Sequence, residues 1–246
     1  ERLACGHMLR PDAPGELPEI FAGGWIGYFA YEAGRFIERL PSTALQDIAL
    51  PIARFALYDS AAVFDHVTGR WTAAAADFGG FPRPPLGERL DFWERLLRSA
   101  ERDTWCLANP ATYGPVDYKV SRSRFLRMVE RAREYIAAGD IFQVNLARRE
   151  TVRAVEPAIQ LYQRLRQTNP AAYAAFLAWS ADSGDGLADR DCAILSSSPE
   201  LFLQTDGRCV TTRPIKGTRP RAVDRIADEA MRAELAASPK DRAENL

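Results

Sequence analysis

Apolar, β-prone segments of this chain come in neighbouring pairs joined by short turns, and this arrangement constrains the fold more than any other feature. The segment 66–70 and the dipeptide Asp206-Gly207 have the composition of such turns. The segments they would join are 54–65 with 71–76, and 201–205 with 208–215. Strands with connections this short pair antiparallel, so we predict two β-hairpins.

Segments with a helical pattern lie between the candidate strands. From Ser121 to Ala138 the apolar residues recur at helical spacing, and Gly139 is typical of the position after a helix C-terminus. Further helices are predicted over 88–102, from Pro157 to about 167, and over 224–237. Hairpin-paired strands with helices between some of them predict an α+β fold with mixed, largely antiparallel sheets.

The segment 103–117 contains Pro110, Gly114 and Pro115 and has the composition of a linker. We therefore predict two parts, an N-terminal part at residues 1–110 and a second part at residues 117–246. A chain of 246 residues is long enough to form one large or two small domains.

Composition excludes several classes of function. The formal net charge is −1 and the arginines are scattered among acidic residues, so neither nucleic acid nor a membrane surface is an expected partner. The four cysteines are far apart and form no Cys-x-x-Cys pair. This spacing predicts reduced thiols in a cytoplasmic protein rather than a metal site or a disulfide framework.

Lys216 is unusual because the chain has 32 basic residues and only three of them are lysines. It lies in a Pro- and Gly-bounded segment, Pro-Ile-Lys-Gly-Thr (214–218). An isolated lysine is most often a solvated surface charge. A lysine amine can, however, lose its proton and act as a nucleophile, whereas arginine stays protonated. The backbone amides of Gly217 and Thr218, with the Thr218 hydroxyl, could also form an anion-holding turn.

Glu200 follows a predicted strand and precedes the second hairpin, which returns to Lys216. The hairpin would bring its two ends together, so we expect Glu200 and Lys216 to lie side by side. A carboxylate beside an amine can transfer a proton to a departing hydroxyl. A structural ion pair at the base of the hairpin is an equally good interpretation.

Residues 141–151 alternate between apolar and polar side chains, which predicts a strand with one buried face. Gln143 and Asn145 share its other face. Buried amides need hydrogen-bond partners, so these two side chains are either members of a structural network or ligands of a substrate.

Four motifs occur along the chain in the order Gly-Asp-Ile-Phe-Gln-Val-Asn-Leu-Ala (139–147), Ser-Ser-Pro-Glu (197–200), Pro-Ile-Lys-Gly-Thr-Arg-Pro-Arg (214–221) and Asp-Arg-Ala-Glu-Asn-Leu (241–246). In this order they resemble the chorismate-utilising enzymes, a family that includes anthranilate synthase component I and aminodeoxychorismate synthase component I. The glycine- and aromatic-rich stretch 23–35 is similar to the N-terminal domain of these two enzymes. The resemblance covers nearly the whole chain and implies part of the two-layer fold of anthranilate synthase component I.

The residue at position 216 separates the members of the family. Anthranilate synthases carry alanine there, whereas aminodeoxychorismate synthases resemble this chain in carrying lysine. Gln143 stands where isochorismate-type enzymes place the lysine that activates water, which argues against water as the nucleophile. The resemblance therefore implies amination of chorismate to 4-amino-4-deoxychorismate, on the route to p-aminobenzoate and folate.

The resemblance also implies roles for individual residues. Lys216 would form a covalent adduct with chorismate, and ammonia from a glutaminase partner would then displace it. Glu200 would act as general acid and base, and Glu244 aligns with a ligand of Mg²⁺. Gly217 and Thr218, with Gln143 and Asn145, would bind substrate.

Some features depart from the family pattern. The last motif is cut at Leu246, before the second magnesium glutamate of the family, so we expect residues 1–246 alone to be inactive. Leu201 replaces the arginine usual after the Pro-Glu pair. Two alternatives stay open: an anthranilate synthase component I in which Lys216 is incidental, and a non-catalytic chain that only binds a glutaminase-type partner.

Overall fold

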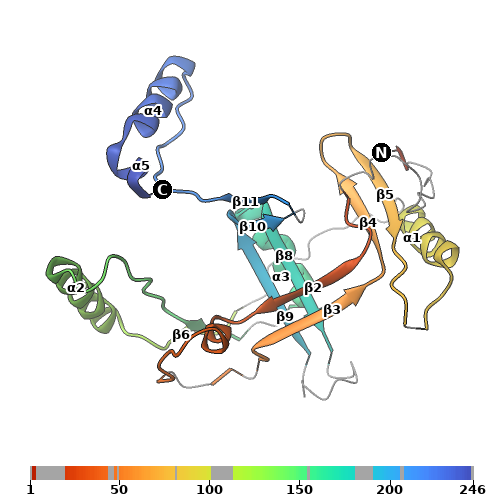
Figure 1. Ribbon diagram of the computed structural model, residues 1–246, viewed down its shortest axis with the longest axis horizontal. Coiled ribbons are helices and arrows are strands. Elements are labelled where there is room, and N and C mark those ends of the chain that lie inside the picture. The colour runs from red at the N-terminus through yellow and green to blue at the C-terminus, as the bar shows by residue number, and fades with distance from the viewer. Residues whose placement is uncertain are drawn as a thin grey trace. The chain divides into compact units, whose positions relative to one another are not determined.

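The computed structural model describes residues 2–3, 20–43, 47–48, 50–80, 82–100, 113–153, 156–180, 191–205 and 208–244. The chain divides into two compact units, the first formed by Glu1–Cys106 with Leu177–Cys192 and the second by Leu107–Phe176 with Ala193–Leu246. Helices alternate with short strands that pair mainly antiparallel (Figure 1). The predicted α+β class is confirmed.

The first unit contains two pairs of antiparallel strands. In one pair, β2 (Gly24–Phe29) lies beside β3 (Ala53–Tyr58) and runs into the 3-10 helix η1 (Tyr31–Phe36). In the other, β4 (Ser60–Asp65) and β5 (Arg70–Ala75) form the predicted hairpin, and β1 (Arg2–Leu3) adds to β5 in parallel. The run 54–65, predicted as a single strand, breaks at Asp59 because β3 and β4 pair with different neighbours.

Helix α1 (Leu86–Ala100) packs along the β4–β5 hairpin (Figure 1). Ala74 of β5 is buried, and across the hairpin the rings of Phe64 and Trp71 lie 5.0 Å apart. Arg89 of α1 is also buried, with 6% of its side chain exposed. Its guanidinium donates to the carbonyl oxygens of Asp59 and Ala76, which fixes the helix to the ends of both strands.

Helix α2 (Arg122–Ala138) of the second unit has the predicted ends. The Ser121 hydroxyl accepts a hydrogen bond from the amide of Arg124, as expected of an N-cap. Gly139 adopts the left-handed conformation, with φ of 81°, and its amide donates to Ile136. Both signals are local in the sequence, and the predicted helix is confirmed.

The strand predicted over 141–151 is wrong for most of its length. Only β7 (Glu150–Thr151) is a strand, paired antiparallel with β6 (Asp117–Tyr118). Phe142, expected to be buried, is 86% exposed. A strand requires a hydrogen-bonded neighbour, and alternation of side chains along one segment does not supply one.

Helix α3 (Ala158–Thr168) begins after Pro157, as predicted, and its Tyr162 ring lies 5.3 Å from the Phe176 ring of β8 (Tyr173–Trp179). Strand β9 (Cys192–Ser198) pairs with β8. The second predicted hairpin is formed by β10 (Leu201–Thr205) and β11 (Val210–Arg213), and its turn at Asp206-Gly207 lies outside the described residues.

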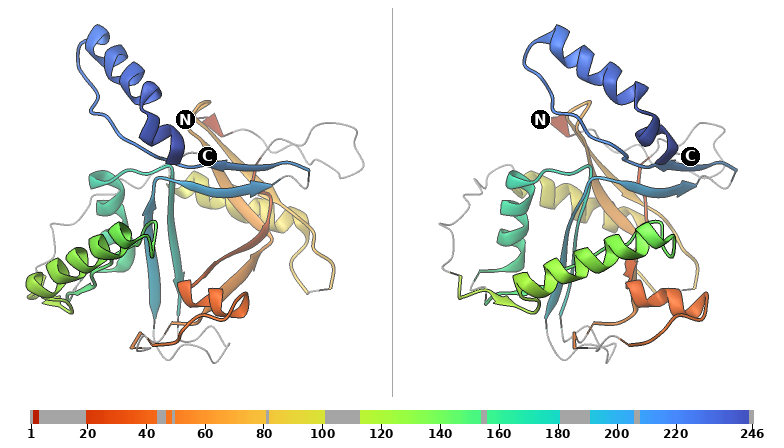
Figure 2. Two further views of the ribbon diagram at one scale, coloured as in Figure 1. Left: turned by 60° about the vertical axis from the view of Figure 1, so that its left-hand side comes forward. Right: turned by 90° about the vertical axis from the view of Figure 1, so that its left-hand side faces the viewer.

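Two helices complete the second unit, α4 (Arg225–Ala237) and the short α5 (Pro239–Glu244). The Asp224 carboxylate caps α4 by accepting from the amide of Ala227. The segment that follows β11 runs alongside α4 before entering it (Figure 2). Among the described residues, no helix combines the length and the hydropathy needed to cross a membrane.

Candidate functional site

Lys216 lies in a short segment between β11 and α4, residues 214–218, which we call the Lys216 loop. Lys216 itself is half-buried, and Thr218 is exposed. Gly217 between them has φ of 71°, in the left-handed region that side chains disfavour. The dihedral angles of Gly217 therefore set the direction of Lys216 relative to the amide of Thr218.

The second hairpin brings Glu200 and the Lys216 loop to the same end. Leu201 lies opposite Arg213, so Glu200 precedes one strand where the loop follows the other. Glu200 is exposed, and its amide donates to the hydroxyl of Ser198, 3.4 Å away. The hairpin thus confirms the predicted approach of the two backbone segments.

The structural ion pair that we considered for Glu200 is not formed. Within the described parts of the chain, no carboxylate oxygen lies within 4.0 Å of the Lys216 ammonium, and no hydrogen bond of this ammonium is found. Proton transfer between Glu200 and a substrate held by Lys216 stays a prediction.

Arg219 ties the Lys216 loop to both C-terminal helices. Its Nε donates to Oε1 of Glu234 in α4 at 2.8 Å, and its Nη2 lies 3.7 Å from Oδ2 of Asp241 in α5. Asp241 has 13% of its side chain exposed. Arg219 and Asp241 belong to two separate sequence motifs, and neither motif indicates their contact, because that contact depends on the path of α4 and α5.

A second ion pair fixes the chain just after the loop. Arg221 donates to both carboxylate oxygens of Asp228 at 2.7 Å, and the amide of Ala222 donates to the same carboxylate. These hydrogen bonds lower the pKa of Asp228 below its ordinary value, and the bond from Arg221 has the largest effect. Residues 219–222 are thereby held against α4 at two points.

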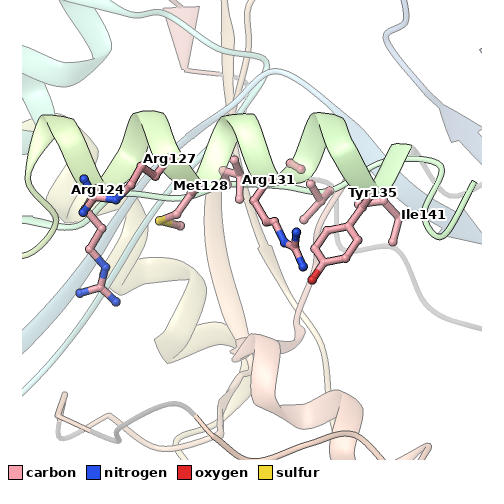
Figure 3. Close-up of a pocket in the computed structure, with 9 residues that line it drawn as sticks. Arg124, Arg127, Met128, Arg131, Tyr135 and Ile141 are labelled. Atoms are coloured by element: carbon pink, nitrogen blue, oxygen red, sulfur yellow. The ribbon is translucent and has the colours of Figure 1, made fainter. Parts of the chain in front are cut away.

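Gln143 and Asn145 are both exposed and lie in the irregular segment after α2. Neither lines the groove of about 480 Å³ between that segment and α2 (Figure 3). Its apolar floor includes Met128, Ile141 and Val144, while Arg124 and Arg131 lie along the helix, Arg131 4.5 Å from the Tyr135 ring. The two amides are exposed outside this groove, and their substrate contacts stay a prediction.

The described residues do not by themselves form a magnesium site. Within that part of the chain there is no group of three or more His, Cys, Asp or Glu side chains that could hold a metal ion. The backbone of Glu244 ends α5, but its side chain lies outside the described residues. Magnesium takes about six oxygen ligands, more than one carboxylate supplies.

The chain matches known proteins over a range that includes these motifs. A family model described as chorismate binding enzyme matches residues 4–246. Anthranilate synthase component 1 of Thermus thermophilus is 37% identical over 253 residues, covering 100% of this chain and 49% of the relative. Aminodeoxychorismate synthase component 1 of Escherichia coli is 34% identical over 238 residues, covering 97% of this chain and 47% of the relative.

A solved structure shares the fold. The anthranilate synthase component I from Streptococcus pneumoniae superposes with a TM-score of 0.67 at 25% identity, covering 96% of this chain and 49% of that one. The chain therefore spans about half the length of the curated relatives it matches. Relatives named for two different reactions have comparable identity to it, so the match fixes the family and leaves the reaction open.

Proposed function

Because the chain belongs to the chorismate-binding enzyme family, we propose that the protein aminates chorismate to 4-amino-4-deoxychorismate. The observation that carries this proposal is Lys216 in the segment Pro-Ile-Lys-Gly-Thr. By the resemblance, aminodeoxychorismate synthases have lysine at this position and anthranilate synthases have alanine. Lys216 is half-buried, and among the described residues no carboxylate pairs with its ammonium or competes for it, which supports this role.

In the first step, the neutral amine of Lys216 attacks C2 of chorismate. A bond forms between Nζ and C2, the ring double bonds shift, and the bond between C4 and its hydroxyl oxygen breaks. The hydroxyl accepts a proton from Glu200 and leaves as water, while the new secondary amine gives up one proton. A covalent nucleophile divides one difficult displacement into two easier steps.

In the second step, ammonia adds at C4, the double bonds shift back, and the bond between C2 and Nζ breaks as Nζ takes back from solvent the proton that it lost in the first step. Glu200, now a carboxylate, accepts the proton that the added ammonia loses. The amides of Gly217 and Thr218 would hold a substrate oxygen beside the lysine, and Gln143 and Asn145 would contribute further contacts.

Two further participants belong to the proposal. A glutamine amidotransferase component would supply the ammonia, so the reaction would use glutamine with that partner and ammonium salts without it. Mg²⁺ is the proposed cofactor, with Glu244 as one ligand, and when bound it would neutralise substrate carboxylate charge. No step above depends on the metal.

A second candidate function is that of anthranilate synthase component 1. The 37% identity to the Thermus thermophilus enzyme favours it. In that case Lys216 would be incidental, and the product would be anthranilate.

Mass spectrometry of the natural full-length gene product incubated with chorismate tests the proposal. We expect a mass gain equal to chorismate less one water, mapped to Lys216 and absent from Lys216→Ala. Lys119→Ala is the matched control, because Lys119 is exposed and paired with Asp117 at 2.6 Å. It should leave the adduct unchanged.

Identification of the product separates the two candidates. With ammonium ions, the unsubstituted protein should release 4-amino-4-deoxychorismate, and Lys216→Ala should release little. If Lys216→Ala instead makes anthranilate as fast as the parent protein, the proposal is wrong and the second candidate stands.

A further inference from the structure

Asp241 of α5 lies directly against the backbone of Gly217. A Cβ atom at position 217 would lie 2.5 Å from Cγ of Asp241 and 2.6 and 2.9 Å from its two carboxylate oxygens. These are the three nearest heavy atoms, and each is closer than real Cβ contacts allow. The carboxylate therefore occupies the space that any side chain at position 217 would need.

The position of Asp241 is itself fixed. Its amide donates to the Ser238 hydroxyl at 3.3 Å, at the start of α5. Its carboxylate lies 3.7 Å from Arg219, whose guanidinium also donates to Glu234. The contact between Asp241 and Gly217 is thus supported by Ser238, and by Arg219 together with Glu234 of α4.

The conformation of Gly217 controls the groups on either side of it. Lys216 immediately precedes it, and the amide of Thr218 immediately follows, so a change of the dihedral angles at residue 217 redirects one relative to the other. A nucleophile displaced by about 1 Å can lose about a hundredfold in rate. A residue that fixes the dihedral angles of Gly217 therefore affects the rate of the reaction without contacting the substrate.

We propose that Asp241 is the positioning residue of the Lys216 loop: its carboxylate packs against Gly217, holds the left-handed turn and so aims the Lys216 amine. This role rests on the proposed function, because it takes Lys216 as the nucleophile. Arg219 contributes by holding the carboxylate in place.

The test uses the natural full-length gene product and three substitutions at these positions. Asp241→Ala removes the packing group, Asp241→Asn keeps its shape, and Gly217→Ala introduces the clashing Cβ. The matched control is Asp228→Ala, which breaks the ion pair between Arg221 and α4. Asp228 lies in α4 and holds Arg221 and Ala222, just after the loop, whereas Asp241 lies in α5 and packs against Gly217.

The rate of covalent adduct formation on Lys216 is the main measurement. Asp241→Ala should lower this rate and kcat by at least about tenfold, with a smaller change in KM for chorismate. Asp241→Asn should restore the rate to within about threefold of the parent, because packing rather than charge carries the effect. Asp228→Ala should lower Tm at least as much as Asp241→Ala but leave the adduct rate nearly unchanged.

A double-mutant cycle tests the contact itself. Gly217→Ala should lower the adduct rate by at least about tenfold in the parent protein, and by clearly less once Asp241→Ala has removed the clashing carboxylate. Equal losses in both backgrounds would overturn the proposal. So would equal effects of Asp241→Ala and Asp228→Ala on the adduct rate.

Hydrogen exchange separates failure of this inference from failure of the proposed function. Asp241→Ala should speed exchange of the amides of Gly217 and Thr218 several-fold, and Asp228→Ala should not. If the parent protein forms no adduct, the proposed function fails and the exchange rates still judge the contact. Unchanged exchange in Asp241→Ala would show that Asp241 does not hold the loop.

Discussion

The guanidinium of Arg89 lies 3.3 Å from the Asp59 carboxylate and also donates to the main-chain carbonyl oxygen of the same residue. A further hydrogen bond reaches the carbonyl of Ala76 at 2.8 Å. One side chain of α1 thus satisfies acceptors at the ends of two strands, and its own exposure is only 6%.

Arg89→Met should therefore destabilise the first unit strongly. The substitution leaves the Ala76 carbonyl without its Arg89 donor, and it removes the ion-pair partner of Asp59, whose carbonyl keeps only the amide of Ala76. An acceptor left unsatisfied costs about 1–3 kcal/mol, and the lost hydrogen bond from a charged donor contributes about 1.5–3 kcal/mol. We expect the free energy of unfolding in urea to fall by at least about 2 kcal/mol. Arg98→Met is the control, since Arg98 is 61% exposed and pairs with Glu94 on the same helix. It should cost no more than about 0.5 kcal/mol, and equal losses would contradict the prediction.

Tyr113→Phe should change the pH dependence of stability. The Tyr113 hydroxyl donates to the Glu156 carboxylate, and this bond, followed by that of Arg164, lowers the pKa of Glu156. A pKa lower in the folded than in the unfolded chain stabilises the fold above the unfolded value, about 4.3, and this stabilisation disappears as pH falls through the folded value.

The substituted chain should therefore be less stable than the parent at pH 7, with a difference that vanishes in strong acid. Unfolding by denaturant at a series of pH values measures it. Tyr118→Phe, at an exposed tyrosine of the same unit, should show no such dependence. A constant difference at all pH values would mean that the hydroxyl does not act through Glu156.

Two glycine-to-alanine substitutions should have opposite effects. Alanine would meet no atom within 4 Å at either Gly139 or Gly87, so only the backbone differs. Gly139 has φ of 81°, and alanine there should cost about 1–2 kcal/mol. Gly87 lies within α1 without a positive φ, and alanine should add about 0.5–1 kcal/mol. Thermal unfolding measures both, and changes of the same sign would refute the argument.

Lys216→Arg should abolish the proposed chemistry while keeping the positive charge. A guanidinium stays protonated at any usable pH and cannot attack chorismate. We expect product formation with ammonium ions to fall as far as in Lys216→Ala, measured by chromatography of the products. Lys119→Arg should be as active as the parent. Substantial activity in Lys216→Arg would point to an electrostatic rather than a nucleophilic role.

Features that depend on neighbours in the sequence were predictable. Ser121 and Gly139 mark the ends of α2 because capping and left-handed termination are local interactions. The second hairpin followed from the turn composition at Asp206-Gly207, and its register brings Glu200 close to the Lys216 loop. The family motifs identified the same two residues independently of the fold.

Features that depend on partners distant in the sequence could not be predicted. The alternation at 141–149 suggested a strand, but a strand needs a neighbour that the segment cannot specify. Burial of Arg89 in α1 follows from where the ends of β4 and β5 lie, which no helical pattern encodes. The contact between Gly217 and Asp241 depends in the same way on the path of α4 and α5.

The contact between Gly217 and Asp241 also couples two positions that a chimeric enzyme could inherit from different parents. A crossover between positions 217 and 241 would join a loop from one parent to a helix from another, and only a glycine opposite the Asp241 carboxylate avoids a collision. A chimera that keeps Asp241 should therefore fold well only with a parent that supplies glycine at position 217.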